Sequence, residues 1–93
     1  MINNFRCKET RKIFDGTVSC KFPQNIQQRA RRKLRMLNNA RVLDDLRIPP
    51  SNHLEKLMGD RLGQHSIKIN DQWRICFVWQ EGIVIDVEIV DYH

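Results

Sequence analysis

Residues 66–90 have the sequence SIKINDQWRICFVWQEGIVIDVEIV, and their pattern determines the expected architecture. Apolar residues alternate with polar ones through most of this stretch, which is the pattern of strands that bury one face. Two interruptions, NDQ at 70–72 and QEG at 80–82, divide it into three runs. The second ends in glycine, which suits the left-handed position of a three-residue hairpin loop. The stretch therefore predicts consecutive antiparallel strands joined by three-residue loops.

The register of these strands predicts a core face and a polar face. The core face holds Ile67, Ile69, Trp73, Ile75, Phe77, Trp79, Ile83, Ile85, Val87 and Ile89, and the polar face holds Gln64, Ser66, Lys68, Arg74, Cys76, Asp86 and Glu88. Counting through the loops places Lys68 opposite Arg74 and Arg74 opposite Glu88. Two interpretations follow. Either Glu88 neutralises Arg74 on a solvated face, or Arg74 and Lys68 are held together for a phosphate, which a guanidinium grips through two hydrogen bonds.

The remaining chain predicts helices before the sheet. The expected elements are a short strand at 2–6, a short helix at 9–15 stopped by Gly16, a helix at 23–38, a helical turn at 42–47, a loop at 48–52, and strands at 54–58, 64–69, 73–79 and 83–90. The long helix has apolar residues spaced 4, 4 and 3 apart, and five cations within residues 29–35. We expect one α+β domain over residues 1–93, with two to three helices packed on one face of a small antiparallel sheet.

Composition narrows the partners. The chain has a net charge of +5 and a pI near 9.5, which favours polyanions such as nucleic acid. Cys7, Cys20 and Cys76 lie far apart in no C-x-x-C spacing, so we expect reduced thiols and no metal site. Cys76 is either a reactive thiol beside the polar face or a small residue that fills the sheet. No signal peptide or membrane span is recognisable, so we expect a cytoplasmic protein without membrane contact.

A phosphate site on this sheet has the groups that metal-free RNA cleavage requires. The reaction needs a base for the ribose 2′-hydroxyl, a cation for the phosphate and an acid for the departing 5′-oxygen. Glu55, Arg74 and His93 are the candidates for base, cation and acid, because histidine is the side chain that titrates near neutrality. Tyr92 is placed to stack on the substrate or hydrogen-bond to it.

Four motifs resemble the HigB branch of the RelE/ParE superfamily, the toxins of bacterial toxin-antitoxin modules. They are Leu57-Met58-Gly59-Asp60, Ser66-Ile67-Lys68-Ile69-Asn70, Trp73-Arg74-Ile75 and Asp91-Tyr92-His93. The amino-terminal half fits in layout, so the resemblance covers nearly the whole chain. It implies a RelE-like fold and an endoribonuclease that cuts mRNA in the ribosomal A site by attack of the substrate's own 2′-hydroxyl, without metal or cofactor. It also implies a cognate HigA-like antitoxin, with the ribosome, its mRNA and its ribosomal RNA as further partners.

Carried over residue by residue, the resemblance assigns Arg74 to the phosphate and Asp91, Tyr92 and His93 to the terminal catalytic group. Some HigB relatives have a histidine where Glu55 stands and a lysine where Met58 stands. Glu55 instead resembles the carboxylate base of the YoeB branch. The candidate RNA-binding residues are Lys56, Arg61, Lys68, Arg29, Arg31, Arg32, Lys33 and Arg35, the last five as a ribosomal-RNA face of the long helix.

Two other functions stay open at this point. A superfamily member without RNA cleavage, such as a gyrase inhibitor of the ParE kind, would share the fold but typically lacks the catalytic set. A non-catalytic nucleic-acid-binding module would explain the charge, but gives no reason for Glu55, Arg74 and the Asp91-Tyr92-His93 end to occur together.

Overall fold

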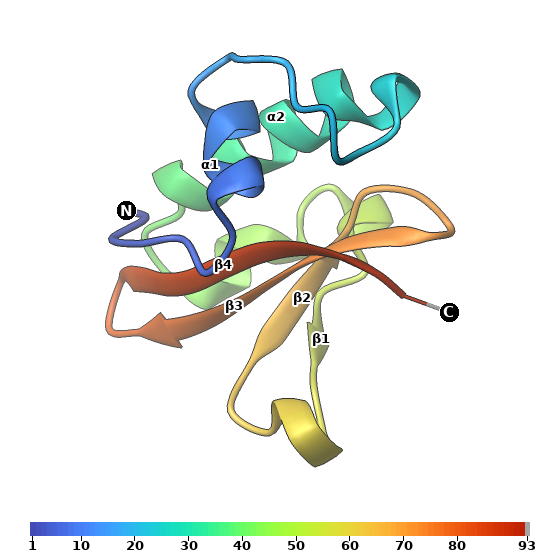
Figure 1. Cartoon of the computed structure of the whole chain (residues 1–93). Coiled ribbons are helices and arrows are strands. Elements are labelled where there is room, and N and C mark those ends of the chain that lie inside the picture. The colour runs from blue at the N-terminus through green and yellow to red at the C-terminus, as the bar shows by residue number, and fades with distance from the viewer. Residues whose placement is uncertain (93) are drawn as a thin grey trace.

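Four antiparallel strands in sequence order form the sheet of the computed structural model, which describes residues 1–92. The strands are β1 (Glu55–Lys56), β2 (His65–Lys68), β3 (Trp73–Gln80) and β4 (Ile83–Asp91). The helices are α1 (Lys8–Phe14) and α2 (Gln24–Asn39), followed by three short 3₁₀ turns, η1 (Leu43–Arg47), η2 (Pro50–Asn52) and η3 (Gly59–Arg61). Both α-helices lie on one side of the sheet, as Figure 1 shows. The predicted α+β class is confirmed.

The core lies between α2 and the sheet. Ile26, Ala30, Leu34 and Leu37 recur on one side of α2 and are buried, which confirms the apolar face predicted from their spacing. They belong to one hydrophobic cluster with buried sheet residues such as Phe77. Burial of each large apolar side chain contributes about 1.5–3 kcal/mol, so this contact fixes which face of the sheet is covered.

The β3–β4 hairpin differs from the prediction by one loop residue. Gln80 pairs with Ile83, so the loop contains two residues and not three. Glu81 has φ 49° and Gly82 has φ 85°, and two successive positive φ angles are those of a type I′ turn, whose twist matches that of the strands. Sequence reasoning counted Gln80 as a loop residue because it allowed a positive φ only at the glycine.

A β-bulge follows in β4. The pairs Val78–Ile85 and Cys76–Glu88 leave one β3 residue facing two residues of β4, of which Asp86 has φ 55°. Asn4 holds the bulge, since its Oδ1 accepts from the backbone N–H of Asp86 at 3.0 Å and its Nδ2 donates to the Asp86 carboxylate at 3.2 Å. The Asp86 side chain is thereby hydrogen-bonded to the amino-terminal segment. The prediction that it belongs to the row of polar residues on the sheet was wrong.

The loop and the bulge together correct the predicted core face. Val84 is fully buried, whereas Ile83 is 48% exposed and Ile85 is half-buried. The shorter loop moves Val84 to the covered face, and the extra residue at the bulge restores Val87 and Ile89 to it. Ile83 and Ile85 therefore lie off the core face, against the prediction.

One of the two predicted cross-strand pairs of Arg74 is present. Lys68 faces Arg74, which confirms the β2–β3 register. Arg74, however, faces Val90, and Glu88 faces Cys76. The predicted pair of Arg74 with Glu88 was wrong because the counting missed both the shorter loop and the bulge.

The amino-terminal segment runs beside the outer edge of β4. Ile2 and Phe5 form isolated parallel bridges with Val84 and Val87, where the sequence predicts a short strand at 2–6. Phe5 also contacts Phe14 of α1, with ring centroids 5.5 Å apart. This segment ties the edge of the sheet to the helical layer.

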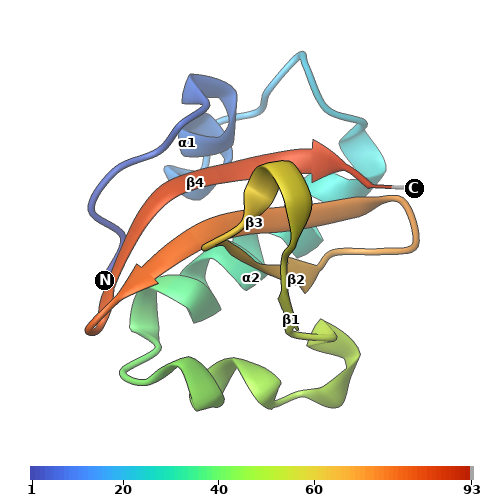
Figure 2. The same cartoon turned by 90° about the horizontal axis from the view of Figure 1, so that it is seen from below.

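The second face of the sheet is free of helices α1 and α2. Seen from below, the β1–β2 connection crosses in front of β3 and β4 in Figure 2, and η3 is the yellow turn near residue 60. Neither helix within residues 1–92 is long and apolar enough to cross a membrane. The open face, partly walled by η3, is where the predicted polar residues gather.

Candidate functional site

A row of polar side chains crosses all four strands on the open face. The strand pairs Glu55–Ser66, Ser66–Cys76 and Cys76–Glu88 place these four residues side by side. Cys76 is completely buried in the middle of the row, and burial raises the pKa of its thiol, so the thiol stays protonated. The row therefore presents one carboxylate at each end and a filled sheet between them, as expected of Cys76 as a packing residue.

Arg74 lies beside this row and is only 7% exposed. Its Nε donates to the Ser66 hydroxyl at 2.8 Å, and its Nη2 donates to the backbone carbonyl of His53 at 2.5 Å. Glu55 Oε2 lies 3.9 Å from the same Nη2, and the Tyr92 ring lies 5.5 Å from the guanidinium carbon. Nη1 makes no hydrogen bond to any of residues 1–92. These contacts fix the guanidinium plane and leave one terminal nitrogen for an anion.

The structure thus brings together three predicted catalytic residues, Glu55, Arg74 and Tyr92. The Glu55 side chain is 48% exposed, so solvent or a substrate reaches its carboxylate. Asp91 accepts from the Gln72 side chain at 3.0 Å, at the end of the β3–β4 ladder rather than against Arg74. His93, the predicted acid, lies outside the described residues.

The other carboxylate of the row, Glu88, binds different cations from the one predicted. Its Oε2 lies 3.2 Å from Nη1 of Arg61 and 3.7 Å from Nη1 of Arg6. Arg61 also donates to Gln64 at 3.1 Å, which fastens η3 over the sheet. The interpretation in which Glu88 neutralises Arg74 was therefore wrong. Arg61, predicted as an RNA contact, lines the same open face as Arg74.

Lys56 and Lys68 occupy different surroundings. Lys68 is on the open face opposite Arg74, and its Nζ lies 2.9 Å from the fully exposed carboxylate of Asp71. Lys56 pairs with His65, so its side chain leaves β1 on the face opposite that of Glu55. Only Lys68 adjoins Arg74 directly.

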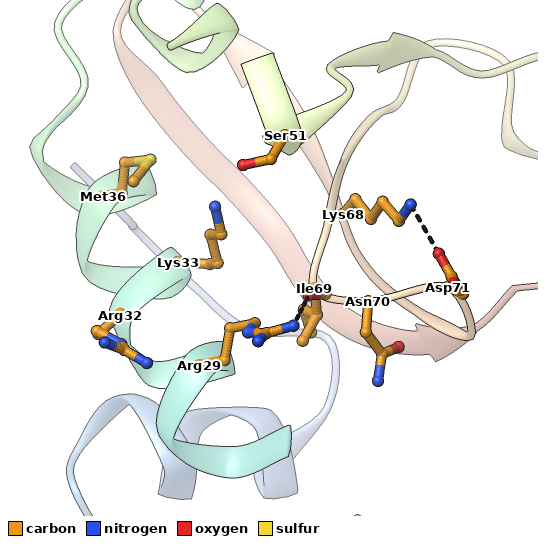
Figure 3. Close-up of a pocket in the computed structure, with 9 residues that line it drawn as sticks. All are labelled: Arg29, Arg32, Lys33, Met36, Ser51, Lys68, Ile69, Asn70 and Asp71. Carbon is orange, nitrogen blue, oxygen red and sulfur yellow. Dashed lines mark hydrogen bonds and ion pairs between the residues drawn. The ribbon is translucent and has the colours of Figure 1, made fainter. Parts of the chain in front are cut away.

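The five cations of α2 do not form the single face that the sequence predicts. Arg29, Arg32 and Lys33 line a cleft beside the β2–β3 loop, drawn in Figure 3. Arg31 lies instead against the segment after α1, where a side chain at Gly16 would meet its guanidinium at 2.9 Å. Arg35 is exposed. The 3.6-residue period spreads consecutive cations around the helix, so residues 31 and 35 lie on another side from residues 29, 32 and 33.

The sequence interpretation missed two groups that hold Arg74. Ser66 was predicted to lie on the polar face but was given no role, although its diagonal position from Arg74 in the predicted register was a usable signal. The His53 carbonyl had no sequence signal. It reaches Arg74 because His53 has φ 44° after the η2 turn, which redirects the chain into β1.

No group of three or more potential metal ligands occurs in the part of the chain that the structure describes. His65 packs against an aromatic ring and belongs to no group of potential metal ligands among the described residues. It stacks on Phe77 with ring centroids 6.1 Å apart, and burial, followed by the nearby charge of Lys56, lowers its pKa. The arrangement on the open face therefore offers a fixed guanidinium, an accessible carboxylate and an aromatic ring, which suit binding and acid–base chemistry at a phosphate.

Comparison with known proteins assigns the chain to a family. Residues 3–93 match the model of the RelE-like toxin of type II toxin-antitoxin system HigB, and the chain belongs to this family. It is 41% identical over 64 residues to "Toxin HigB-1" of Vibrio cholerae, covering 69% of this chain and 67% of that protein. It is 29% identical to "Endoribonuclease HigB" of Proteus vulgaris over the whole of both chains.

The fold is shared with a solved toxin structure. The crystal structure of the heterotetrameric YoeB-YefM toxin-antitoxin complex from Staphylococcus aureus matches with a TM-score of 0.61 at 16% identity, covering 100% of this chain and 98% of that chain. At this identity the likeness concerns the fold alone. It confirms the RelE-like architecture expected from the sequence.

Proposed function

We propose that this toxin is a metal-independent endoribonuclease that cuts mRNA in the ribosomal A site and so stops translation. The observation that carries the proposal is the placement of Arg74. A buried guanidinium is held by Ser66, His53 and Glu55 on an otherwise open face, and its Nη1 makes no hydrogen bond within residues 1–92. The name of the full-length relative, an endoribonuclease, supports the same activity.

In the proposed reaction, Glu55 takes the proton from the ribose 2′-hydroxyl, and the 2′-oxygen attacks the adjacent phosphorus. The bond from phosphorus to the 5′-oxygen breaks, and the departing oxygen receives a proton from His93. The products are a 2′,3′-cyclic phosphate and a 5′-hydroxyl. Arg74 stabilises the charge that develops on the phosphate, and a preoriented donor of this kind is typically worth 10²–10³ in rate.

Tyr92 and Asp91 complete the proposed catalytic group. The Tyr92 ring already lies 5.5 Å from the Arg74 guanidinium and is 43% exposed, so it offers a surface on which a base can stack. Asp91 holds the end of β4 through Gln72. The backbone N–H of Tyr92 donates to the Gln72 carbonyl at 2.6 Å, which keeps the ring beside Arg74.

The proposed partners are a HigA-like antitoxin and the ribosome with its mRNA and ribosomal RNA, in the cytoplasm. Membership of a toxin-antitoxin family and the likeness to a toxin-antitoxin complex support the antitoxin. The proposed RNA-binding residues are Lys56, Arg61, Lys68, Arg29, Arg31, Arg32, Lys33 and Arg35. Because the α2 cations point in several directions, we assign them to more than one RNA segment.

Primer-extension mapping on a defined mRNA tests this function. The purified protein is incubated with the mRNA in the presence and absence of programmed ribosomes, with His93→Gln as the inactive control. Cuts at A-site codons that require ribosomes and disappear in His93→Gln are the expected result. No cleavage by folded protein in either arm would refute it and would favour a target such as gyrase.

A further inference from the structure

The cleft beside α2 is a second concave, basic feature of the molecule. It has a volume of about 570 Å³ and lies between α2 and the β2–β3 loop. Figure 3 shows Arg29, Arg32 and Lys33 on one side and Lys68 and Asn70 on the other. Three cations of α2 and Lys68 of β2, whose ammonium points toward Asp71, thus line one hollow between two elements that are far apart in the sequence.

The cations of the cleft are poorly neutralised. The only carboxylate among its lining residues is Asp71, which is fully exposed and lies 2.9 Å from Lys68. Arg29 donates to the Ile69 carbonyl at 3.3 Å, and Lys33 donates to the buried side chain of Asn52, and neither acceptor carries a charge. Burial, followed by the charges of Arg29 and Arg32, lowers the pKa of Lys33, as expected where like charges are held together.

Lys68 links the cleft to the strand pair that carries Arg74. Lys68 lines the cleft and is also the direct cross-strand partner of Arg74. Directly opposite residues on neighbouring strands lie about 4.5–5.5 Å apart, so an anion bound at Lys68 adjoins one bound at Arg74. Lys68 is held by a single exposed carboxylate, and an exposed ion pair of this kind is easily exchanged for a phosphate.

We propose that this cleft binds a backbone phosphate of the same RNA strand whose scissile phosphate lies at Arg74. The position of the strand rests on the proposed function. A nucleic-acid strand fits the lining better than an acidic peptide helix, because Met36 and Ile69 are the only apolar residues in it, and Ser51 and Asn70 add hydrogen-bonding groups. Arg32 and Lys68 are the phosphate ligands, while Arg29 and Lys33 are anchored by Ile69 and Asn52.

Fluorescence anisotropy with labelled oligoribonucleotides tests the proposal without requiring cleavage. The probes are a dinucleotide and a nonanucleotide, both 2′-O-methylated so that no 2′-hydroxyl remains to attack. The variants are Arg32→Gln, Lys68→Gln and their combination. Lys8→Gln is the matched control, because it removes one charge from an exposed residue of α1, outside the cleft and the catalytic site. Thermal unfolding checks that every variant is folded.

The expected result is a loss of nonanucleotide affinity of about 3- to 10-fold in each single variant. For a single strand, the slope of log K against log salt falls by about 0.7 for each phosphate contact removed, and Lys8→Gln leaves it unchanged. Dinucleotide binding stays at the wild-type level in Arg32→Gln. Nonanucleotide affinities equal to that of Lys8→Gln overturn the proposal.

Two further outcomes separate the possibilities. A competition arm measures the affinity for poly-glutamate. If poly-glutamate binds wild type more tightly than Arg32→Gln, and both proteins bind RNA equally well, the cleft is a site for an acidic peptide and the proposal is overturned. If the wild type cleaves no mRNA but the cleft variants lose nonanucleotide affinity, the cleft binds RNA and the nuclease function is refuted. The two failures are therefore distinguishable.

Discussion

Removal of the Ser66 hydroxyl tests how the fold holds Arg74. Ser66 is completely buried, and its Oγ accepts from Arg74 Nε at 2.8 Å, where Arg74 itself is 7% exposed. In Ser66→Ala, a buried cationic donor loses its partner, and hydrogen bonds to charged groups contribute about 1.5–3 kcal/mol. For a domain of 60–100 residues, a loss of about 2 kcal/mol lowers Tm by roughly 8–16 °C.

A double-mutant cycle with Arg74→Met isolates this bond, measured by urea unfolding at equilibrium. In the Arg74→Met background no guanidinium remains to be stranded, so Ser66→Ala is expected to cost less than about 0.5 kcal/mol, giving a coupling energy above about 1 kcal/mol. Ser51→Ala, the same change at an exposed serine, is the control. Effects that add within about 0.3–0.5 kcal/mol would refute the claim that Ser66 positions Arg74.

Three further predictions concern the turn, pH and the cleft. Gly82→Ala places a side chain at φ 85° and is expected to cost about 1–2 kcal/mol in thermal unfolding, while Gly82→Asn costs less; equal stabilities would contradict the assigned turn. The folded protein holds the pKa of His65 below its usual 6.5, so in the window just below pH 6.5 the unfolded chain binds more protons than the folded one. The free energy of unfolding therefore rises with pH through this window, and the contribution of His65 is complete above pH 6.5. In urea titrations at several pH values, His65→Gln should flatten this rise; an unchanged slope would exclude His65 as its source. Asp71→Asn releases Lys68 and is expected to raise affinity for the nonanucleotide by about 1.5- to 5-fold in anisotropy titrations; weaker binding would show that Asp71 is not a competitor of the phosphate.

The strands and their register were predicted correctly from the sequence up to the β2–β3 hairpin. Alternation defined the strands, and counting through residues 70–72 placed Lys68 opposite Arg74 correctly. It failed in β4, because Glu81 accepts a positive φ and Asp86 bulges out, and no periodicity announces either event. The bulge depends on Asn4, which is 82 residues away in the chain. The register of β4 therefore depends on tertiary contacts.

The site was predictable in its residue types more than in its contacts. Glu55, Arg74 and Tyr92 were named from the sequence, and the fold brings them together. Of the two groups that orient Arg74, Ser66 was a diagonal neighbour in the predicted register but was given no role, and the His53 backbone carbonyl had no sequence signal. The α2 cations showed the opposite failure, because a run of charges was treated as one surface when the helical period separates Arg31 and Arg35 from the other three.

The proposed mechanism requires Glu55 and Arg74 to act together on the RNA phosphate. The decisive measurement is the single-turnover rate of mRNA cleavage on programmed ribosomes for the wild type, Glu55→Gln and Arg74→Lys, with Lys8→Gln as control. Glu55→Gln keeps the size of a side chain that is 48% exposed, so the variant is expected to stay folded. Arg74→Lys keeps the charge but loses the planar fork.

Glu55→Gln is expected to lower the rate by about 10²–10⁴, the usual contribution of a general base, and Arg74→Lys to lower it by at least about 10². Lys8→Gln is expected to cleave at the wild-type rate. A folded Glu55→Gln protein that cleaves at the wild-type rate would contradict the assignment of the base and, with it, the proposed mechanism of the open face.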